Sequence, residues 1–429
     1  MHRIVVVGGG AGGLELAARL GDDLGRKGRA EVLLIDETMV HVWKPLLHEV
    51  AAGTLPDSVG SVDFLQQARR HGFRFHLGSM ASLDRPARQV WLAPLLDEQG
   101  GEIAPRRPIP YDTLVIAVGS VVNDFGTRGV REHAMALNDA AEAERFHRRL
   151  LAECARAELQ GGGPVEIAIV GGGATGVELA AELVETIREI ASYGMHLRDL
   201  PQPVHVRVIE SGDRLVGALP EQASASVQAD MEAAGVEVML RQRVTEVASD
   251  HVLLADGRRL PAHITVWAAG IQGAGWLREL GLQTNRQGQL VVHPTLQTLE
   301  DDAIFAMGDC ASCQPSPSEK PVPPRAQAAH QEAMFLAGAL SRRLKGRPLP
   351  AFAFRDRGSL VSLGRRNAVG SITQAARGRH LLLEGWSARV AYWFLYRQHL
   401  ATLHGVVRTV LMTIGGWLTS RSHTRVKLH

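Results

Sequence analysis

Short aliphatic and β-branched runs alternate with longer helical patterns along most of the chain. Four of these runs are mostly apolar, as is typical of strands buried on both faces of a parallel sheet. They occupy residues 4–7, 31–35, 165–170 and 204–209. A helix is expected after the first strand of each pair, over residues 14–20 and 177–183. Strands that alternate with helices in this order predict an α/β fold with Rossmann-like domains.

A glycine cluster separates the first strand from its helix. Gly8, Gly10 and Gly13 occupy the three positions of the pattern G-x-G-x-x-G, and Gly12 precedes the last of them. The first glycine permits a tight turn, the second lets the backbone approach a pyrophosphate, and the third lets the helix pack closely on the strand. Asp36 ends the next strand, where a carboxylate can accept hydrogen bonds from a ribose diol.

The same arrangement recurs one domain's length later. Gly171, Gly173 and Gly176 repeat the glycine spacing, and Glu210 ends the strand that follows. One such pattern is weak evidence because glycine-rich turns are common, but two copies with strand, helix and acid predict two dinucleotide sites. An acid at Glu210 would repel a 2′-phosphate, which favours NADH over NADPH.

Each of the two repeated regions ends in a similar segment. Residues 111–119 and 263–270 each read as a buried strand that ends in a small residue and a glycine. These ends, Ala117 and Gly119 in the first and Ala269 and Gly270 in the second, suit close passage beside a ligand. Two dinucleotide sites in one chain indicate electron transfer between a resident flavin and a nicotinamide that comes and goes.

Composition narrows the class of protein. The 429 residues are enough for two or three domains, and 45% hydrophobic with 21% charged residues excludes general disorder. Lys and Arg number 47 against 45 Asp and Glu, a balance that argues against nucleic acid as a partner. Only 3 Cys are present, so no disulfide framework is expected. The chain shows no secretory signal and no unbroken apolar run of the ~18 residues that span a bilayer.

With these features the chain resembles the flavoprotein superfamily that has two dinucleotide-binding domains. In that superfamily the first glycine motif holds FAD and the second holds NAD(P)H. Residues 304–309 resemble its late FAD motif, in which a strand ends in Gly308-Asp309 and the aspartate meets the ribitol of the flavin. A simple Gly-Asp turn is the structural alternative.

Three segments resemble the type II NADH dehydrogenases, which reduce quinone without pumping protons. Residues 41–53 look like the family's aromatic-x-Pro-Leu-Leu stretch, which implies that Lys44 lies near the flavin. Residues 117–126 look like its glycine-serine and Asn-x-Phe-Gly segment. Residues 324–331 resemble its Ala-Gln-x-Ala-x-Gln motif at the quinone pocket. The resemblance extends from residue 3 to about residue 420.

The last of these motifs also has a physical interpretation. A helix is expected over residues 326–340, and Gln327 and Gln331 would share one of its faces. Neutral amides can bond a quinone carbonyl without the desolvation cost of a charge. The alternative is an exposed Ala-rich helix with incidental glutamines.

Glu178 lies in the first helical turn after the second glycine motif. The resemblance implies that this acid approaches the nicotinamide and the flavin, so we assign it a catalytic role. An acid in a first turn also stabilises the helix dipole by about 0.3–1 kcal/mol, which is the structural alternative.

The cysteines argue against two related enzyme classes. Disulfide reductases need a C-x-x-C pair shortly after the first unit, and none occurs there. Sulfide:quinone oxidoreductases use well-separated cysteines, whereas Cys310 and Cys313 lie together and Cys154 lies in a helix-like segment. The Cys310/Cys313 pair is a structural pair, a redox pair or half of a metal site; no complete metal site is expected.

The C-terminal tail has a composition of its own. No Asp or Glu occurs from Gly385 onward, and aromatic residues are dense. The basic residues there are Arg389, Arg397, Arg408, Arg421, Arg425 and Lys427. Aromatic residues flanked by cations suit the interface of an anionic membrane. The resemblance implies peripheral attachment at the cytoplasmic face of the inner membrane, and a helical hairpin that packs on the core or forms a homodimer is the alternative.

The expected organisation has four segments. Residues 1–160 and 276–345 form the FAD-binding domain, residues 161–275 the NADH-binding domain, and residues 346–429 a membrane-associating region of strands and amphipathic helices. The expected activity is FAD-dependent oxidation of NADH with reduction of quinone to quinol. A soluble NADH-dependent flavoprotein reductase, a sulfide:quinone-like enzyme and a non-catalytic NADH-binding sensor are the alternatives.

Overall fold

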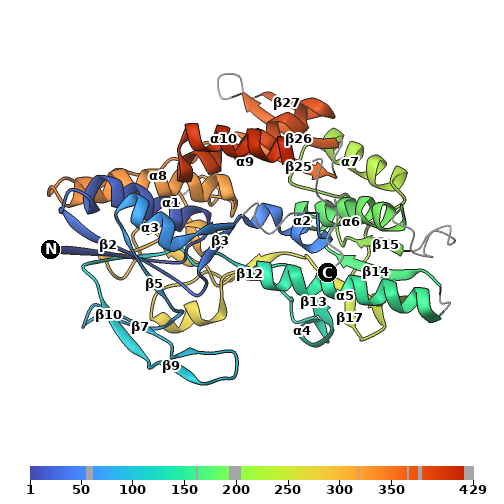
Figure 1. Ribbon diagram of the computed structural model, residues 1–429, viewed down its shortest axis with the longest axis horizontal. Coiled ribbons are helices and arrows are strands. Elements are labelled where there is room, and N and C mark those ends of the chain that lie inside the picture. The colour runs from blue at the N-terminus through green and yellow to red at the C-terminus, as the bar shows by residue number, and fades with distance from the viewer. Residues whose placement is uncertain are drawn as a thin grey trace. The chain divides into compact units, whose positions relative to one another are not determined.

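The structure is a computed structural model that describes residues 1–54, 61–160, 163–192, 204–316, 318–364, 367–374 and 379–419. The chain divides into two units, and each is described by itself (Figure 1). Unit 1 comprises Met1–Trp43, Ser61–Val121 and Ile271–Arg355. Unit 2 comprises Lys44–Gly60, Val122–Gly270 and Asp356–His429.

A parallel sheet with the strand order β23-β11-β1-β2-β5 forms the centre of unit 1. Its strands are β1 (His2–Val7), β2 (Ala30–Asp36), β5 (Arg74–Leu77), β11 (Thr113–Ile116) and β23 (Ile304–Ala306). β1 pairs with β2 from His2 opposite Ala30 to Val7 opposite Ile35. Residues 4–7 are buried, which confirms the strand that their β-branched side chains predict.

The helices of unit 1 are α1 (Ala11–Leu20), α3 (Phe64–His71) and α8 (Ala326–Arg343). α8 is the helix expected over residues 326–340, and it extends to Arg343. α1 packs on α8 at Gly12, where a Cβ atom would lie 2.6 Å from Met307 Cε and 3.0 Å from the carbonyl oxygen of Ala329. Glycine at this position therefore allows the close approach of the two helices.

Smaller elements complete unit 1. An antiparallel sheet has the order β10-β7-β6, with β6 (Met80–Asp84), β7 (Gln89–Leu92) and β10 (Arg107–Pro110). Short pairs are β3 (Val40–Val42) with β4 (Ser61–Asp63), β8 (Leu95–Leu96) with β9 (Glu102–Ala104), and β22 (Leu290–Val292) with β24 (Ala311–Cys313). Short helical segments are η1 (Gly21–Gly25), η4 (Gly275–Leu280) and η5 (Gly308–Cys310). The short segments β12 (Val121–Val122) and β21 (Ile271–Gln272) lie where the chain passes from one unit to the other.

Unit 2 contains a second parallel sheet, with the strand order β13-β20-β14-β15-β16. Its strands are β13 (Ala134–Met135), β14 (Val165–Val170), β15 (Val204–Ile209), β16 (Glu237–Met239) and β20 (Ile264–Trp267). β14 pairs with β15 from Val165 opposite Val204 to Val170 opposite Ile209. The order β20-β14-β15 matches β11-β1-β2 of unit 1, so the expected duplication of an α/β unit is confirmed.

The helices of unit 2 are α2 (Leu47–Ala52), α4 (Val130–His133), α5 (Ala140–Gln160), α6 (Ala174–Ser192), α7 (Glu221–Ala233), α9 (Trp386–His404) and α10 (Val406–Thr419). A 3₁₀ turn, η2 (Lys44–Leu46), leads into α2. One antiparallel sheet contains β17 (Val244–Val247), β18 (His251–Leu254) and β19 (Arg259–Pro261). Another contains β25 (Gly358–Leu363), β26 (Asn367–Gln374) and β27 (Arg379–Glu384).

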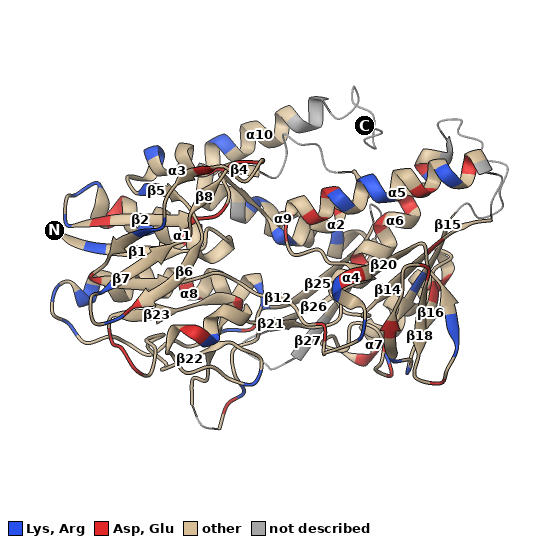
Figure 2. Cartoon of the chain, turned by 90° about the horizontal axis from the view of Figure 1, so that it is seen from below, with Lys and Arg blue, Asp and Glu red and all other residues tan. Residues whose placement is uncertain are grey.

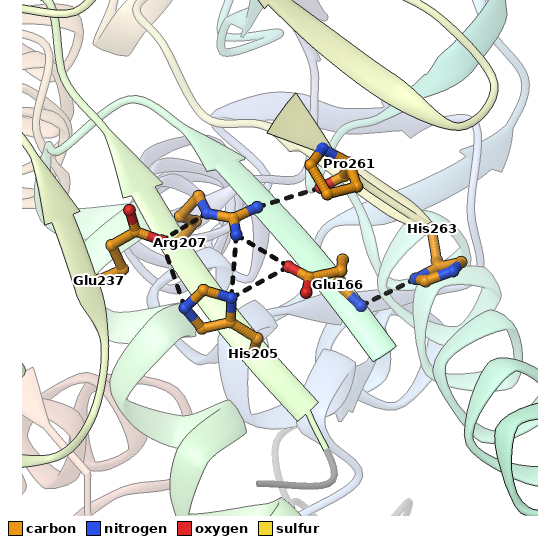
Figure 3. A network of polar contacts seen from close by, with 6 residues as sticks. All are labelled: Glu166, His205, Arg207, Glu237, Pro261 and His263. Carbon is orange, nitrogen blue, oxygen red and sulfur yellow. Dashed lines mark hydrogen bonds and ion pairs between the residues drawn. The ribbon is translucent and has the colours of Figure 1, made fainter. Parts of the chain in front are cut away.

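An ionic network crosses three strands of the unit 2 sheet (Figure 3). The buried guanidinium of Arg207 on β15 contacts Glu166 on β14 at 3.0 Å and Glu237 on β16 at 2.5 Å. It also donates to the carbonyl oxygen of Pro261 at 3.1 Å. His205 lies between the same two acids, with Nδ1 3.0 Å from Glu166 and Nε2 3.3 Å from Glu237. The network therefore joins three adjacent strands.

The two units divide the chain differently from the four expected segments. Residues 122–160 and 356–429 both belong to unit 2. The reason is packing: α5 contacts α2 and β14, β25 contacts α6, and α9 contacts β26. The ligand that each segment binds stays a prediction.

The C-terminal region forms the helices α9 and α10, within the segment where strands and amphipathic helices are expected. In the part of the chain that the structure describes, no helix is both long enough and apolar enough to cross a bilayer. Arg421, Arg425 and Lys427 lie outside the described residues.

Candidate functional site

The first glycine turn joins β1 to α1 in unit 1. Gly8 has a φ of +103°, and a Cβ atom there would lie 2.4 Å from the carbonyl oxygen of Ala117. A Cβ at Gly13 would lie 1.9 Å from the carbonyl oxygen of Gly8, whereas a Cβ at Gly10 would meet no described atom within 4 Å. Gly10 caps α1 without a side-chain hydrogen bond. The turn thus offers open space beside the first N–H groups of a helix, which suits a phosphate.

The second glycine turn, between β14 and α6 in unit 2, repeats this backbone geometry. Gly171 has a φ of +113°, and a Cβ there would lie 2.7 Å from the carbonyl oxygen of Ala268. A Cβ at Gly176 would lie 2.0 Å from the carbonyl oxygen of Gly171. A Cβ at Gly173 would meet no described atom within 4 Å. Each unit therefore carries one turn that fits a dinucleotide pyrophosphate.

Each acid at a strand end is bonded to its own glycine turn. Asp36 accepts the Gly9 N–H at 2.6 Å, and Glu210 accepts the Gly172 N–H at 2.6 Å. The second carboxylate oxygen of Asp36 accepts two hydrogen bonds from Thr38. The second carboxylate oxygen of Glu210 accepts the Gly212 N–H at 2.6 Å and a longer hydrogen bond from Ser211. A carboxylate has about four acceptor positions, so roughly one remains on each acid for a ribose hydroxyl.

The Gly308-Asp309 turn is held from three directions in unit 1. Ser120 donates to the Asp309 carboxylate at 2.9 Å, and the Gln289 amide donates to the Asp309 carbonyl oxygen at 2.9 Å. Gly308, with a φ of +70°, donates its N–H to the buried Glu332 of α8 at 2.6 Å. Burial, and then the nearby Asp309, raises the pKa of Glu332 to about 8. A fixed short acceptor at a strand end fits the polyol chain of a flavin.

The two strand ends expected to pass close to a ligand lie beside the glycine turns. Ala117 and Gly119 follow β11, and Ala117 contacts Gly8. Ala269 and Gly270 follow β20, and Ala269 contacts Gly171. Gly119 and Gly270 have φ values of +71° and +69°, a conformation that favours glycine.

The two glutamines of α8 have different surroundings. The Gln331 amide donates to the carbonyl oxygen of Arg355 at 2.9 Å and accepts the Arg355 N–H at 3.0 Å. Gln327 is half-buried in the first turn of the helix. Gln331 therefore ties α8 to the segment at Arg355, and a quinone contact there stays a prediction for both residues.

Glu178 is a buried carboxyl on α6, 8% exposed, in unit 2. The expected first-turn position is wrong, because α6 already begins at Ala174 and its first turn contains no acid. Its Oε1 accepts the Ser362 N–H at 3.0 Å, and its Oε2 lies 3.8 Å from Nδ1 of the buried His48. Burial raises the pKa of Glu178 to about 8, with Glu49 and Glu182 as further causes, while the Ser362 bond opposes the shift. A neutral carboxyl of this kind can hold a proton at neutral pH, which an exposed first-turn acid cannot do.

The C-terminal region supplies part of the surroundings of Glu178, through Ser362 and Arg389. Arg389 of α9 donates to Ser362 Oγ at 2.9 Å and to the carbonyl oxygen of Gly364 at 2.6 Å. Burial lowers the pKa of His48 to about 4, and the Arg389 charge adds to this shift. Lys44, in η2, is exposed, and its place near the flavin stays a prediction.

Sequence reasoning missed four of these groups. Glu332 and Ser362 support Asp309 and Glu178 through contacts far apart in sequence, and nothing in their local pattern marks them. His48 and His330 lie inside the segments that carry the family resemblance, so a search for titratable groups in those segments finds them. His330 pairs with the buried Glu15 of α1 at 2.6 Å.

Cys310 ends η5, and Cys313 ends β24. Both thiols are free and buried, and the Cys310 thiol lies 3.2 Å from the carbonyl oxygen of Met307. Burial raises the pKa of each thiol to about 12, which disfavours the thiolate form at neutral pH. No group of three or more His, Cys, Asp or Glu among the described residues is arranged to hold a metal ion.

Comparisons with known proteins agree with this geometry. Residues 2–333 match the family model described as pyridine nucleotide-disulphide oxidoreductase. The type II NADH:quinone oxidoreductase of Haemophilus influenzae is 41% identical over 100% of both chains. Its counterpart in Staphylococcus aureus is 28% identical over 86% of this chain and 89% of its own length.

A solved structure has the same fold. NDH2 from Plasmodium falciparum in complex with NADH superimposes with a TM-score of 0.84 over 100% of this chain and 99% of that chain, at 19% identity. The paired glycine turns, the family model and the full-length identity lead to one conclusion: this chain belongs to the pyridine nucleotide-disulphide oxidoreductase family and, within it, to the type II NADH:quinone oxidoreductases.

Proposed function

We propose that this chain oxidises NADH and reduces a quinone to quinol by way of bound FAD, without pumping protons. The observation that carries the proposal is the pair of glycine turns, one in each unit, with identical acid-to-turn bonds of 2.6 Å. Two such turns suit two dinucleotides in one chain. The 41% identity to a type II NADH:quinone oxidoreductase supports the choice of quinone as the acceptor.

The chain's own residues bind and orient these molecules. Bound FAD supplies the two-electron chemistry between NADH and quinone. The residues assigned to FAD are Gly8, Gly10, Gly12, Gly13, Asp36, Lys44, Ala117, Gly119, Gly308 and Asp309. Those assigned to NADH are Gly171, Gly173, Gly176, Glu210, Ala269 and Gly270. Glu178 holds a proton in a buried position, and Gln327 and Gln331 orient the quinone.

The visible spectrum of the purified protein tests the proposal. The protein should be yellow, anaerobic NADH should bleach it, and a short-chain quinone should restore the colour. Rapid restoration by quinone excludes a sensor that binds NADH without turnover, and bleaching by sulfide would favour the sulfide:quinone alternative. A colourless protein that stays colourless when FAD is added would refute the assignment.

Substitution of each of the two glutamines of α8 distinguishes a role in quinone binding from a role in stabilising the fold. Gln331→Leu should lower the free energy of unfolding by about 1 kcal/mol, because it removes two bonds to the Arg355 backbone, and should raise the quinone KM. Gln327→Leu, on the same helix, should raise the quinone KM without that loss. NADH-driven bleaching should stay normal in both. A destabilised Gln331→Leu protein with an unchanged quinone KM would remove Gln331 from the quinone site.

We also propose that α9 and α10 attach the protein peripherally to a membrane, at its cytoplasmic face. α10 is almost free of charge, as Figure 2 shows, and it exposes Val406, Val407, Val410, Leu411 and Ile414. α9 exposes Trp386, Trp393 and Phe394. An apolar surface of this kind, with Arg397 and Arg408 on the same helices, suits a bilayer that contains anionic lipid. A second copy of the chain, in a homodimer, is the alternative occupant.

Two negative charges introduced on α10 should strongly weaken this membrane attachment. The variant Val407→Glu/Leu411→Glu changes side chains that are 76% and 64% exposed, so its melting temperature should stay the same. Partition onto anionic liposomes should fall by about a hundredfold, because apolar burial worth roughly 1.5 kcal/mol per side chain is lost. Leu159→Glu, at an exposed site on α5, should still bind. Normal liposome binding together with a lost dimer in sedimentation would favour the second copy.

A further inference from the structure

Phe125 of unit 2 is an aromatic residue that the nucleotide assignments leave unused. Its φ is +50°, a left-handed conformation that bulky side chains rarely adopt, and 65% of its surface is exposed. Both features cost free energy, one through backbone strain and the other through apolar surface in water. Strained residues persist where the surroundings hold them in place, and they cluster at ligand sites.

The surrounding segment holds Phe125 firmly. The Asn123 side chain accepts the Phe125 N–H at 2.9 Å, and the Asp124 side chain accepts the Gly126 N–H at 2.9 Å. Asp124 also pairs with Arg131 at 2.6 Å. The indole of Trp267 on β20 donates to the carbonyl oxygen of Asn123 at 2.8 Å. The strained turn is therefore anchored to β20 and is not an unrestrained loop.

The ring of Phe125 lies against Gly270. A Cβ atom at Gly270 would lie 2.7 Å from Cζ and 3.1 Å from Cε2 of the phenyl ring. Gly270 follows Ala268 and Ala269, which contact Gly171 of the second glycine turn. The exposed ring thus stands at the edge of the sheet where the glycine turn lies.

The strand order decides which half of a dinucleotide the ring would meet. Glu210 follows β15, on one side of β14, whereas Gly270 and Phe125 lie on the β20 side. A dinucleotide with its pyrophosphate at Gly171–Gly176 and its adenosine ribose at Glu210 extends its other half across β14 toward β20.

We propose that Phe125 is a positioning residue for NADH, whose ring packs against the nicotinamide–ribose half of the bound molecule. This inference rests on the proposed oxidation of NADH. The ring gives the nicotinamide half an apolar, rigid wall with little conformational entropy to lose, and the strained backbone fixes the direction in which the ring points.

Thermal stabilisation by two ligands tests the proposal. NAD⁺ and ADP-ribose share the adenosine, the pyrophosphate and one ribose, and only NAD⁺ carries the nicotinamide. Both should raise the melting temperature of the wild-type holoenzyme. In Phe125→Gly the rise in melting temperature with NAD⁺ should be largely lost, whereas the rise with ADP-ribose should be retained. The melting temperature without ligand should not fall, because glycine adopts this φ without strain.

Kinetics and matched variants complete the test. The NADH KM of Phe125→Gly and Phe125→Leu should rise about tenfold, which corresponds to roughly 1.4 kcal/mol, with an unchanged quinone KM. Phe125→Tyr should restore the wild-type values, and Leu159→Ala, at an exposed site on α5, should have no effect. Equal loss of the NAD⁺ and ADP-ribose shifts, or an unchanged NADH KM in both variants, would overturn the proposal. Failure of the proposed function would appear differently, as wild-type flavin that NADH does not bleach.

Discussion

Glu178→Gln protein is expected to turn over at least about a hundredfold more slowly than the wild type. Glutamine matches the size of the protonated acid and can still accept the Ser362 N–H, but it cannot exchange a proton. Loss of a positioned acid or base lowers rates by about 10²–10⁴-fold. Stopped-flow bleaching by NADH and steady-state quinone reduction measure the effect separately. Unchanged kinetics would reject the catalytic role of Glu178.

The pH dependence of the same variant gives an independent check. The pKa of Glu178 is raised from 4.5 to about 8, chiefly by burial, so the folded protein keeps a proton between these values that the unfolded chain has released. Stability should therefore fall as the pH rises through this window, and Glu178→Gln should remove that part of the slope. Wild-type turnover should decline above pH 8, where the donor loses its proton, and the variant should lack that limb. Urea unfolding at pH 5 and pH 8 measures the first effect.

Single alanine substitutions in the two glycine turns should distinguish the FAD site from the NADH site. Gly13→Ala protein should be colourless, because the new Cβ would lie 1.9 Å from the carbonyl oxygen of Gly8 and would force α1 away from the first turn. Gly176→Ala protein should be yellow but resist bleaching, because its Cβ would lie 2.0 Å from the carbonyl oxygen of Gly171. Overpacking of about 3 kcal/mol corresponds to a loss of NADH affinity of about a hundredfold.

Two other glycines serve as controls for this pair. A Cβ at Gly338 in unit 1 or at Gly217 in unit 2 would meet no described atom within 4 Å, so alanine should be tolerated at both positions. FAD content by absorbance and NADH affinity by bleaching titration measure the outcome. Loss of colour in Gly176→Ala with retention in Gly13→Ala would exchange the assignments of the two turns.

Local sequence was sufficient to predict the central strands of the two sheets and their glycine turns. β1 and β14 are nearly continuous apolar runs, and each is followed at once by glycines whose spacing has one structural interpretation. The strand, turn, helix and acid all lie within one α/β unit, so neighbouring residues determine them. The helix at residues 326–340 was also predictable from its alanine-rich composition, and only its end at Arg343 differs.

The surroundings of the candidate site depend on contacts that no local pattern reveals. Glu178 and Ser362 are bonded although 184 residues separate them, and Ser120 and Asp309 although 189 do. The hydrogen bond from Gln331 to the Arg355 carbonyl oxygen likewise depends on the path of the chain after α8, which brings Arg355 beside Gln331. The extent of unit 2 depends on the same kind of contact, because α5 and α9 join it through packing against α2, β14 and β26.

The ionic network in Figure 3 has a consequence for how the sheet of unit 2 assembles. Most residues of β14 and β15 are aliphatic, and these residues alone would tolerate sliding of one strand past the other. Arg207 contacts Glu166 and Glu237 only when all three strands have their native alignment. A slipped strand would leave the buried guanidinium of Arg207 without its carboxylate partners. These ion pairs therefore favour the native alignment of the three strands over slipped alignments during folding.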